Sequence, residues 1–225
     1  MGNISVSIFI VTISFLLYHF LSGNGKLKTY MQFRFGEEQG QIRSIIFNRL
    51  LGAFLFAATA LFNFVNKLPI SGSEINIKYK PLLFLIFLFP IIINKFAAKG
   101  ASNLAMYPQI RAKVWSKNLI IISAISWLAY LLGYEIMFRG VLFYNCLNEM
   151  DLFSAIIINI SIYSLVHIPK GFNETIGALP MGIILCFLTW FTGSIWAAFV
   201  LHSLLALTNE WFSLKYNSEM KISQL

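Results

Sequence analysis

The chain has 225 residues, of which 58% are hydrophobic and only 12% are charged, and its mean hydropathy is +0.73. An ordinary soluble domain carries about 25% charged residues, so this composition excludes a soluble globular protein and indicates an integral membrane protein. In a soluble chain the net charge of +8 would suggest a nucleic-acid partner, but here the basic residues follow the loops between apolar segments. We therefore expect no nucleic acid to bind.

Seven apolar segments are long enough, or nearly so, to cross the roughly 30 Å hydrocarbon core as helices. In chain order they are residues 4–22, 45–66, 81–98, 118–146, 152–168, 176–191 and 193–212. Backbone groups in lipid must be satisfied internally, and no segment alternates as barrel strands do. The sequence therefore predicts an all-α, multi-pass transmembrane bundle of about seven spans in contact with the lipid bilayer. We divide the chain into N-terminal transmembrane segments (1–117), a functional core (118–212) and a tail (213–225).

Basic residues are distributed unevenly between the two sides of this bundle. With seven spans, eleven lie on one side and three on the other, so the positive-inside rule places the N-terminus outside and the C-terminus in the cytoplasm. The eleven are Lys26, Lys28, Arg34, Arg43, Lys99, Arg111, Lys113, Lys117, Lys170, Lys215 and Lys221, and the three are Lys67, Lys78 and Lys80. Arg49 and Lys95 lie near span ends, where we expect their charged heads to reach the interface.

The fourth predicted span contains an embedded charge pair, Glu135 and Arg139, in the stretch "GYEIMFRG". A spacing of four residues puts both side chains on one helix face. Alone, this pair is equally consistent with a structural ion pair between helices. A charge near the centre of a bilayer costs roughly 2.5 to 3.5 kcal/mol, however, so the pair must be neutralised, hydrated or functional.

The later spans add further polar residues. Tyr163 and His167 repeat the four-residue spacing, and Glu174 lies in the loop that follows. His202 lies ~14 Å into the last span, and Asn209 follows seven residues later on the same face. A single intramembrane histidine is more often a packing residue than a catalyst. The conjunction of these residues in consecutive spans nevertheless predicts that Glu135, Arg139, His167 and His202 converge on one cavity.

At these residues the sequence resembles the CPBP intramembrane proteases, also called Abi or CAAX-type proteases, which include the type II prenyl-CAAX endopeptidases. Their first motif is Glu-Glu-x-x-x-Arg, and "YEIMFRG" matches it from the second Glu onward. Their second motif, an aromatic residue followed four positions later by His, is met by Tyr163 and His167. Their third is met by "FTGSIWAAFVLH", which ends at His202. The resemblance covers residues 118–212.

Two positions depart from the family pattern. Tyr134 occupies the place of the first Glu, the usual general base, and Ala206 occupies the place of an Asn that helps to hold the oxyanion. The sequence is similar to a branch of the family with an aromatic residue before the single Glu and a further Glu seven residues after the second-motif His. Here "HIPKGFNE" supplies Lys170 and Glu174 at those offsets. The resemblance thus implies a rearranged site, with an inactive one as the alternative.

The resemblance implies an intramembrane endopeptidase acting on a membrane-associated protein or peptide. Glu135 or Glu174 would activate the water, and His167 would share or orient it. His202 would donate to the oxyanion, with Asn209 one turn further on as a substitute for the missing Asn. The fork-shaped guanidinium of Arg139 would fix the rotamer of Glu135. For the Glu174 carboxylate we expect a place within about 8 Å of the His167 ring.

Several alternatives stay open. His167, His202 and Glu135 form a donor set that zinc accepts, but no compact ligand motif is present, so we favour a mechanism without a cofactor. Cys146 and Cys186 show no disulfide or metal spacing. A non-catalytic member that binds a peptide or partner, as in bacteriocin immunity, is the second hypothesis. A small proton-coupled transporter is the third.

The depth of the candidate residues raises a geometric problem. If residues 118–146 form one straight helix that enters from the cytoplasm, Glu135 lies ~25 Å from that side, whereas His167 lies under ~10 Å from it. The two side chains then do not meet. We therefore expect this segment either to begin well outside the bilayer or to bend near Gly133.

Overall fold

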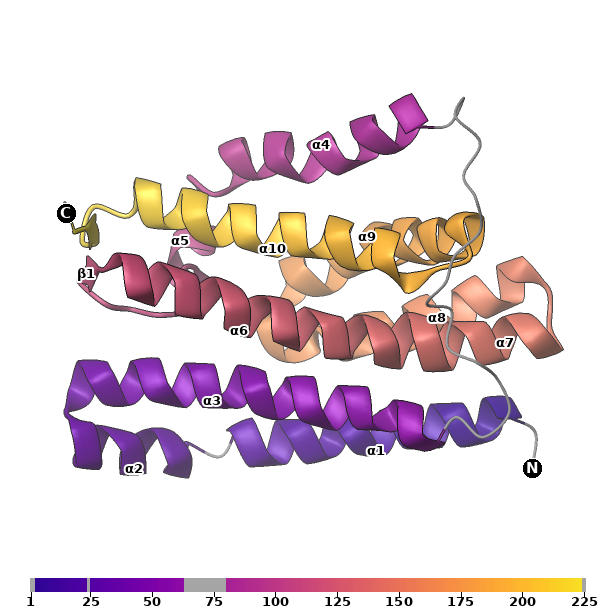
Figure 1. Cartoon of the computed structure of the whole chain (residues 1–225), viewed down its shortest axis with the longest axis horizontal. Coiled ribbons are helices and arrows are strands. Elements are labelled where there is room, and N and C mark those ends of the chain that lie inside the picture. The colour runs from indigo at the N-terminus through magenta and orange to yellow at the C-terminus, as the bar shows by residue number, and fades with distance from the viewer. Residues whose placement is uncertain (1–2, 24, 63–79, 224–225) are drawn as a thin grey trace. The chain divides into compact units, whose positions relative to one another are not determined.

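The computed structural model describes residues 3–23, 25–62 and 80–223, and this part of the chain is almost entirely helical (Figure 1), as the sequence predicted. The longer helices are α1 (Asn3–Gly23), α3 (Glu37–Ala58), α4 (Lys80–Ala97), α6 (Lys117–Glu135), α9 (Phe172–Thr192) and α10 (Ile195–Tyr216). The shorter ones are α2 (Lys26–Phe35), α5 (Ala101–Met106), α7 (Tyr144–Glu149) and α8 (Leu152–Leu165). Two 3-10 turns, η1 (Thr59–Phe62) and η4 (Ile168–Lys170), and one π-helix, η3 (Ile136–Phe143), complete the helical elements described.

Four stretches of the described chain are long and apolar enough to cross a membrane: Ile4–Gly23, Glu37–Leu61, Lys117–Glu149 and Phe172–Thr192. Two apolar helices, Pro81–Ala97 and Leu152–Leu165, are shorter. The protein is thus an integral, multi-pass membrane protein, while the count of seven spans stays a prediction. Residues 63–66 of the second predicted span, together with Lys67 and Lys78, lie outside the described residues.

The third of these stretches answers the depth problem in part. α6, η3 and α7 follow one another without a break, and Lys117–Glu149 comprises 33 residues. At 1.5 Å per residue this stretch is about 50 Å long, well beyond the roughly 30 Å hydrocarbon core. This length fits the first of the two expected solutions, a helix that continues outside the bilayer. The irregularity begins at Ile136, three residues after Gly133, and it is a π-helical turn.

The chain forms two compact units, each assembled from separate stretches. The first comprises residues 1–19, 52–76 and 132–200, and the second comprises residues 20–51, 77–131 and 201–225. The helices α1, α3, α6 and α10 supply residues to both. Each unit draws on both sides of residue 117, and the sequence division at that position stays a prediction.

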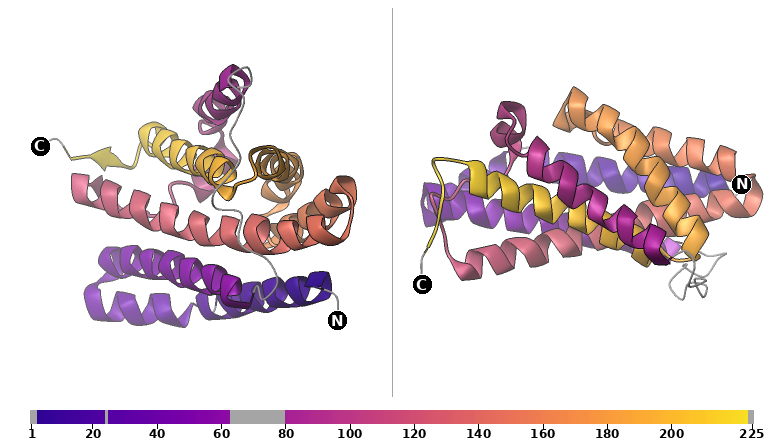
Figure 2. Two further views of the ribbon diagram at one scale, coloured as in Figure 1. Left: turned by 45° about the vertical axis from the view of Figure 1, so that its right-hand side comes forward. Right: turned by 90° about the horizontal axis from the view of Figure 1, so that it is seen from above.

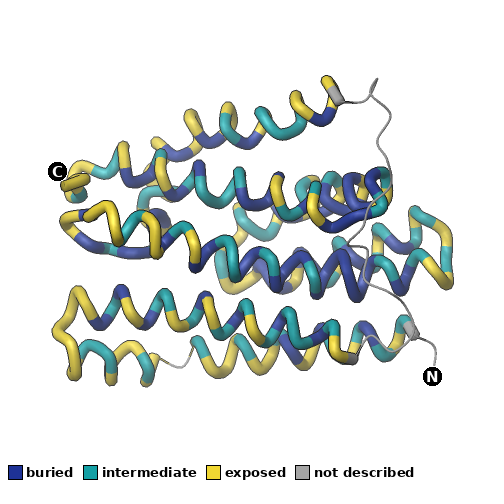
Figure 3. Tube along the Cα trace, in the orientation of Figure 1, coloured by how far each residue is buried: buried dark blue, intermediate teal, exposed yellow. Residues whose placement is uncertain are grey.

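In the first unit, neighbouring helices approach each other closely at two glycines. A Cβ on Gly133 would lie 2.5 Å from the carbonyl oxygen of Ala53, so α6 and α3 touch at a position where a larger side chain has no room. Gly182 on α9 plays a similar part for α8, because its Cβ would lie 3.1 Å from Cδ1 of Tyr163. Figure 2 shows α9 crossing beside α8, and Figure 3 shows the deeply buried stretch that includes residues 137–143. The core of this unit is therefore the packing of η3 against its neighbours.

The second unit is closed by contacts between distant parts of the chain. α2 runs back along the start of α3 after Gly36, and a Cβ on Gly40 would lie 2.4 Å from Cα of Gln32. The strands β1 (Val114–Trp115) and β2 (Lys221–Ile222) form a short parallel pair that joins the loop before α6 to the C-terminal tail. Trp115 lies fully buried in an apolar cluster at this end.

Candidate active site

The Glu135–Arg139 pair lies where the long helix changes from α to π. Glu135 is the last residue of α6, Arg139 lies within η3, and both side chains are completely buried. Arg139 Nη1 donates to Glu135 Oε1 at 3.4 Å, and Arg139 Nε lies 3.4 Å from Oε2. Both distances exceed the roughly 2.7–2.9 Å of a strong charge-assisted hydrogen bond. Single π-turns within α-helices occur frequently at functional sites, so this is the first place to look for chemistry.

The guanidinium of Arg139 also faces an aromatic ring. Its Cζ lies 4.4 Å from the ring centroid of Tyr163, within the range of a cation–π contact. Within the described part of the chain, Nη2 of Arg139 makes no hydrogen bond. Buried polar groups are usually hydrogen-bonded, and those that are not frequently belong to catalytic or ligand sites. Arg139 is thus buried and charge-paired but retains donor capacity.

One face of α8 supplies the neighbours of this pair. Asn159 and Tyr163 lie four residues apart on α8, and His167 follows after another four residues, just beyond the end of α8 at Leu165. The rings of Tyr163 and His167 are tilted by 50° to one another, with centroids 4.7 Å apart. His167 Nδ1 lies 2.7 Å from the Tyr163 carbonyl oxygen, which can only accept, so Nδ1 carries a hydrogen and the lone pair of the neutral ring lies on Nε2. Nε2 is therefore the atom of His167 able to share a proton.

Asn159 was not predicted as a site residue. Its Nδ2 donates to the Phe138 carbonyl oxygen at 2.7 Å, inside η3. The signal was present in "NISIYSLVH", where Asn159 precedes Tyr163 by the same four residues that separate Tyr163 from His167. Reading the motif one turn earlier would have found it.

Tyr134 lies at the centre of an aromatic cluster in the first unit. Its ring centroid lies 4.7 Å from that of Phe138, 5.6 Å from Phe56, 5.8 Å from Tyr163 and 6.2 Å from His167. The side chain is buried, 5% exposed. The position beside Glu135 is therefore filled by a packed ring.

Glu174 lies in the first turn of α9, where a carboxylate interacts favourably with the helix dipole. The chain reaches it through η4 and Gly171, whose φ of 97° favours glycine. Burial lowers the pKa of the Lys170 ammonium, and the nearby Glu174 carboxylate opposes that shift. Glu174 thus lies near enough to Lys170 to influence its pKa, and the predicted distance from the Glu174 carboxylate to the His167 ring stays a prediction.

His202 and Asn209 both lie on α10, in the second unit. His202 is 9% exposed, and the seven-residue spacing puts Asn209 two turns away on the same face. The Asn209 Oδ1 is buried and makes no hydrogen bond within the described part of the chain. Glu135, Arg139 and His167 share the first unit, and their predicted convergence with His202 stays a prediction.

Comparison with known protein families gives one match. Residues 115–208 match a family model described as type II CAAX prenyl endopeptidase Rce1-like. This is a CAAX-protease-type segment. It contains all three motifs that carry the resemblance, so the predicted resemblance of this segment to the CAAX-type proteases is confirmed. Comparisons with curated proteins and with solved structures found no match.

The metal question within the CAAX-protease-type segment stays a hypothesis. In residues 3–23, 25–62 and 80–223, no three His, Cys, Asp or Glu side chains gather as a metal site. The zinc set of the sequence hypothesis combines Glu135 and His167 of the first unit with His202 of the second. Cys186 instead donates from Sγ to Asn159 Oδ1 at 3.2 Å, so its contact is with α8.

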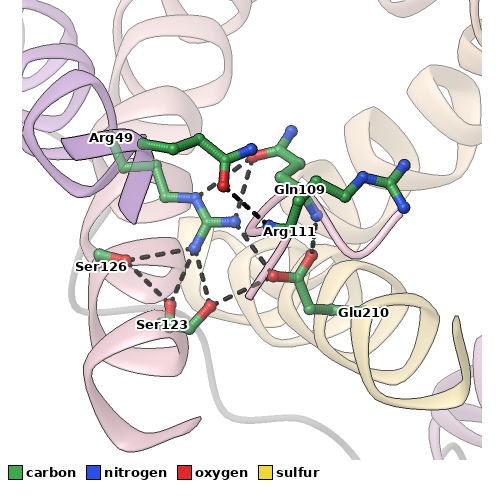
Figure 4. Close-up of polar contacts among 7 residues, drawn as sticks. Arg49, Gln109, Arg111, Ser123, Ser126 and Glu210 are labelled. Carbon is green, nitrogen blue, oxygen red and sulfur yellow. Dashed lines mark hydrogen bonds and ion pairs between the residues drawn. The ribbon is translucent and has the colours of Figure 1, made fainter. Parts of the chain in front are cut away.

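The CAAX-protease-type segment also contains part of a second polar network, and this one corrects a prediction. Arg49 does not reach an interface: it is 3% exposed and pairs with Glu210 at 3.2 Å (Figure 4). Its guanidinium also donates to Gln109, Ser123 and Ser126, and it lies 4.2 Å above the Trp127 ring. The interface prediction was wrong because partners 60 to 161 positions away neutralise the charge inside the second unit.

Proposed function

We propose that the protein is an intramembrane endopeptidase that hydrolyses a peptide bond in a membrane-associated protein or peptide. The observation that carries this proposal is the buried guanidinium of Arg139, which pairs with Glu135 in the first motif of the matched segment while its Nη2 makes no hydrogen bond within the described part of the chain. A purely structural pair at this place has no need of a π-helical turn or of a guanidinium with spare donor capacity. A site that binds a substrate carbonyl or water requires such capacity.

The residues of the first unit suggest a division of labour. Glu135 takes a proton from the attacking water, while Arg139 holds the carboxylate in one rotamer. His167 orients that water through the lone pair on Nε2, and the proton that Glu135 has taken then passes to the leaving amine. The sequence motif offers His202 and Asn209, which lie on α10 in the second unit, as candidate donors to the oxyanion. Glu174 is the alternative base, offered beside Lys170 at the start of α9.

The substrate belongs to the membrane or its surface. The matched family description names a CAAX prenyl endopeptidase, and a lipid-modified or membrane-inserted peptide fits an enzyme whose candidate site lies on long apolar helices. We also propose that the C-terminus is cytoplasmic. A reporter active only in the cytoplasm, fused after the last residue, tests this orientation: activity supports it, and a stably produced but inactive fusion contradicts it.

One observation favours a second function, the binding of a peptide without cleavage. Tyr134 fills the place of the family's first Glu with a packed ring, and Glu135 is completely buried. A site rebuilt for binding can retain the motif geometry without a functional base.

Two variants separate these functions in a cleavage assay with purified protein in lipid nanodiscs. The substrates are CAAX peptides with and without a prenyl group. Glu135→Gln is expected to abolish cleavage. Loss of cleavage in Glu174→Gln would indicate a rearranged site, whereas unchanged cleavage would indicate a site that uses Glu135 alone. Glu149→Gln is the control, because Glu149 is an exposed acid of the same unit. Peptide binding by wild-type protein without cleavage of either peptide supports the second function and contradicts the first.

A further inference from the structure

The amide of Asn159 joins three elements of the first unit. Asn159 lies midway along α8 and is 0% exposed. Its Nδ2 donates to the Phe138 carbonyl oxygen of η3 at 2.7 Å, and its Oδ1 accepts from the Cys186 Sγ of α9 at 3.2 Å. A buried amide with defined partners on two other elements fixes both its own rotamer and the positions of those partners.

The bond from Asn159 reaches the peptide that leads directly to Arg139. The Phe138 carbonyl belongs to the 138–139 peptide bond, three residues after Glu135, within a turn whose backbone departs from the α-helical pattern. Backbone polar groups at membrane depth need partners, and a side chain on a neighbouring helix can supply one where the pattern changes. The hydrogen bond from Asn159 therefore fixes where the 138–139 peptide bond lies along α8.

The guanidinium of Arg139 also contacts α8. Tyr163, one turn after Asn159, lies 4.4 Å from the guanidinium, and His167 follows one turn later. We propose that Asn159 is a positioning residue, which holds the π-helical turn so that Glu135 and Arg139 stay in register with His167. Its effect on cleavage rests on the proposed function, whereas its effect on the geometry of η3 does not.

Selective labelling tests the geometric part without any substrate. Protein labelled with carbonyl-13C phenylalanine and 15N arginine contains both labels in only two peptide bonds, Phe33–Arg34 and Phe138–Arg139. We expect Asn159→Leu to move the Phe138 carbonyl signal upfield and to leave the Phe33 signal in place. Asn159→Ala carries the same test if Asn159→Leu fails to fold, because it removes the amide without added bulk. Cys186→Ala removes only the second contact and is expected to leave the Phe138 signal nearly unchanged.

The matched control is Asn145→Leu. Asn145 is also a buried amide of the first unit, and its Nδ2 donates at 2.7 Å to Ser7 Oγ on α1. In the cleavage assay, Asn159→Ala is expected to lower kcat roughly 10- to 100-fold per folded molecule at similar KM, as misplacement of catalytic groups does. Asn145→Leu is expected to lower the amount of folded protein but not kcat.

The outcomes are separable. An unchanged Phe138 signal in both Asn159 variants, or an equal change in Asn145→Leu, overturns the positioning role. A moved Phe138 signal with unchanged kcat also overturns it, because the register then has no consequence for the reaction. If wild-type protein cleaves neither peptide while the Phe138 signal moves as expected, the proposed function fails and the structural role of Asn159 stands.

Discussion

Two buried arginine–glutamate pairs, one in each compact unit, are held in different ways. In the second unit all three guanidinium nitrogens of Arg49 donate hydrogen bonds, and its face covers Trp127. In the first unit Arg139 faces the Tyr163 ring and donates to Glu135 at 3.4 Å, but its Nη2 makes no hydrogen bond within the described part of the chain. A saturated pair holds structure, whereas a buried pair with spare capacity can accept a ligand. The contrast separates a structural site from a candidate chemical one.

Removing the saturated arginine is expected to have a large effect on stability. Arg49→Met leaves Glu210 buried without its main counter-charge, and breaking such a pair costs about 3–5 kcal/mol of unfolding free energy. Denaturant unfolding in detergent measures the change. Arg43→Met on the same helix is the control: Arg43 is exposed above the Phe35 ring, and its loss should cost about 1 kcal/mol or less. Equal losses would contradict the structural role assigned to Arg49.

Restoring the family's first Glu should not restore chemistry. Tyr134→Glu replaces a buried ring at the centre of the aromatic cluster with a carboxylate beside Glu135, and loss of such a ring alone costs about 3–5 kcal/mol. We expect lower thermal stability and no gain in cleavage. Tyr134→Phe keeps the ring and should cost no more than about 1.5 kcal/mol. A stable Tyr134→Glu protein with faster cleavage would show that this position remains a vacant base site.

Glycine substitutions in the helices of the first unit are expected to change the unfolding free energy by a smaller amount. Gly133→Ala places a Cβ 2.5 Å from the Ala53 carbonyl oxygen, and overpacking of this kind costs about 1–3 kcal/mol. Gly177→Ala on α9 meets nothing within 4 Å, so helix propensity alone should stabilise that variant by about 0.5–1 kcal/mol. Opposite signs of the two changes in unfolding free energy are expected. Matching signs would refute the close contact between α3 and α6.

The smallest expected effect is a pH dependence of thermal stability, caused by the Asp151 carboxyl at the start of α8. Asp151 caps this helix, and hydrogen bonds from the Ser154 side chain and from backbone N–H groups lower the pKa of its carboxyl. A depressed pKa in the folded state means that the stabilisation is present above the unfolded pKa of about 3.9 and disappears as the pH falls through the folded value. Asp151→Asn keeps a capping oxygen but should remove this component from a profile of Tm against pH. If the Tm profiles of the wild type and of Asp151→Asn run parallel below pH ~4, the lowered pKa of Asp151 does not contribute to stability.

Much of the fold could be predicted from the sequence because apolar runs of membrane length dictate helices. All seven predicted segments contain a helix in the described part of the chain, although the second begins earlier, at Glu37, and the fifth ends earlier, at Leu165. The π-turn could not be predicted, since the residues of η3 fit an α-helical spacing equally well. Its register depends on contacts with α8, which the local sequence does not contain.

The candidate site was partly predictable for the same reason. Glu135, Arg139 and His167 stand out because charges in apolar runs are costly, and that cost is visible in the sequence alone. Arg49 gave the wrong prediction because its position near a span end resembles that of a residue reaching the interface. Its partner Glu210 is 161 positions away, and no local pattern reveals such a pair.

The most direct test compares Glu135→Gln with Glu210→Gln in one preparation, with cleavage per folded molecule and the midpoint of unfolding measured for each. The account predicts that Glu135→Gln lowers cleavage by about 100-fold or more, as loss of a general base does, with the smaller change in the midpoint. Glu210→Gln should lower the midpoint more and leave cleavage per folded molecule close to that of the wild type. The reverse pattern, with cleavage lost in Glu210→Gln and retained in Glu135→Gln, would contradict the assignment of chemistry to the first pair and structure to the second.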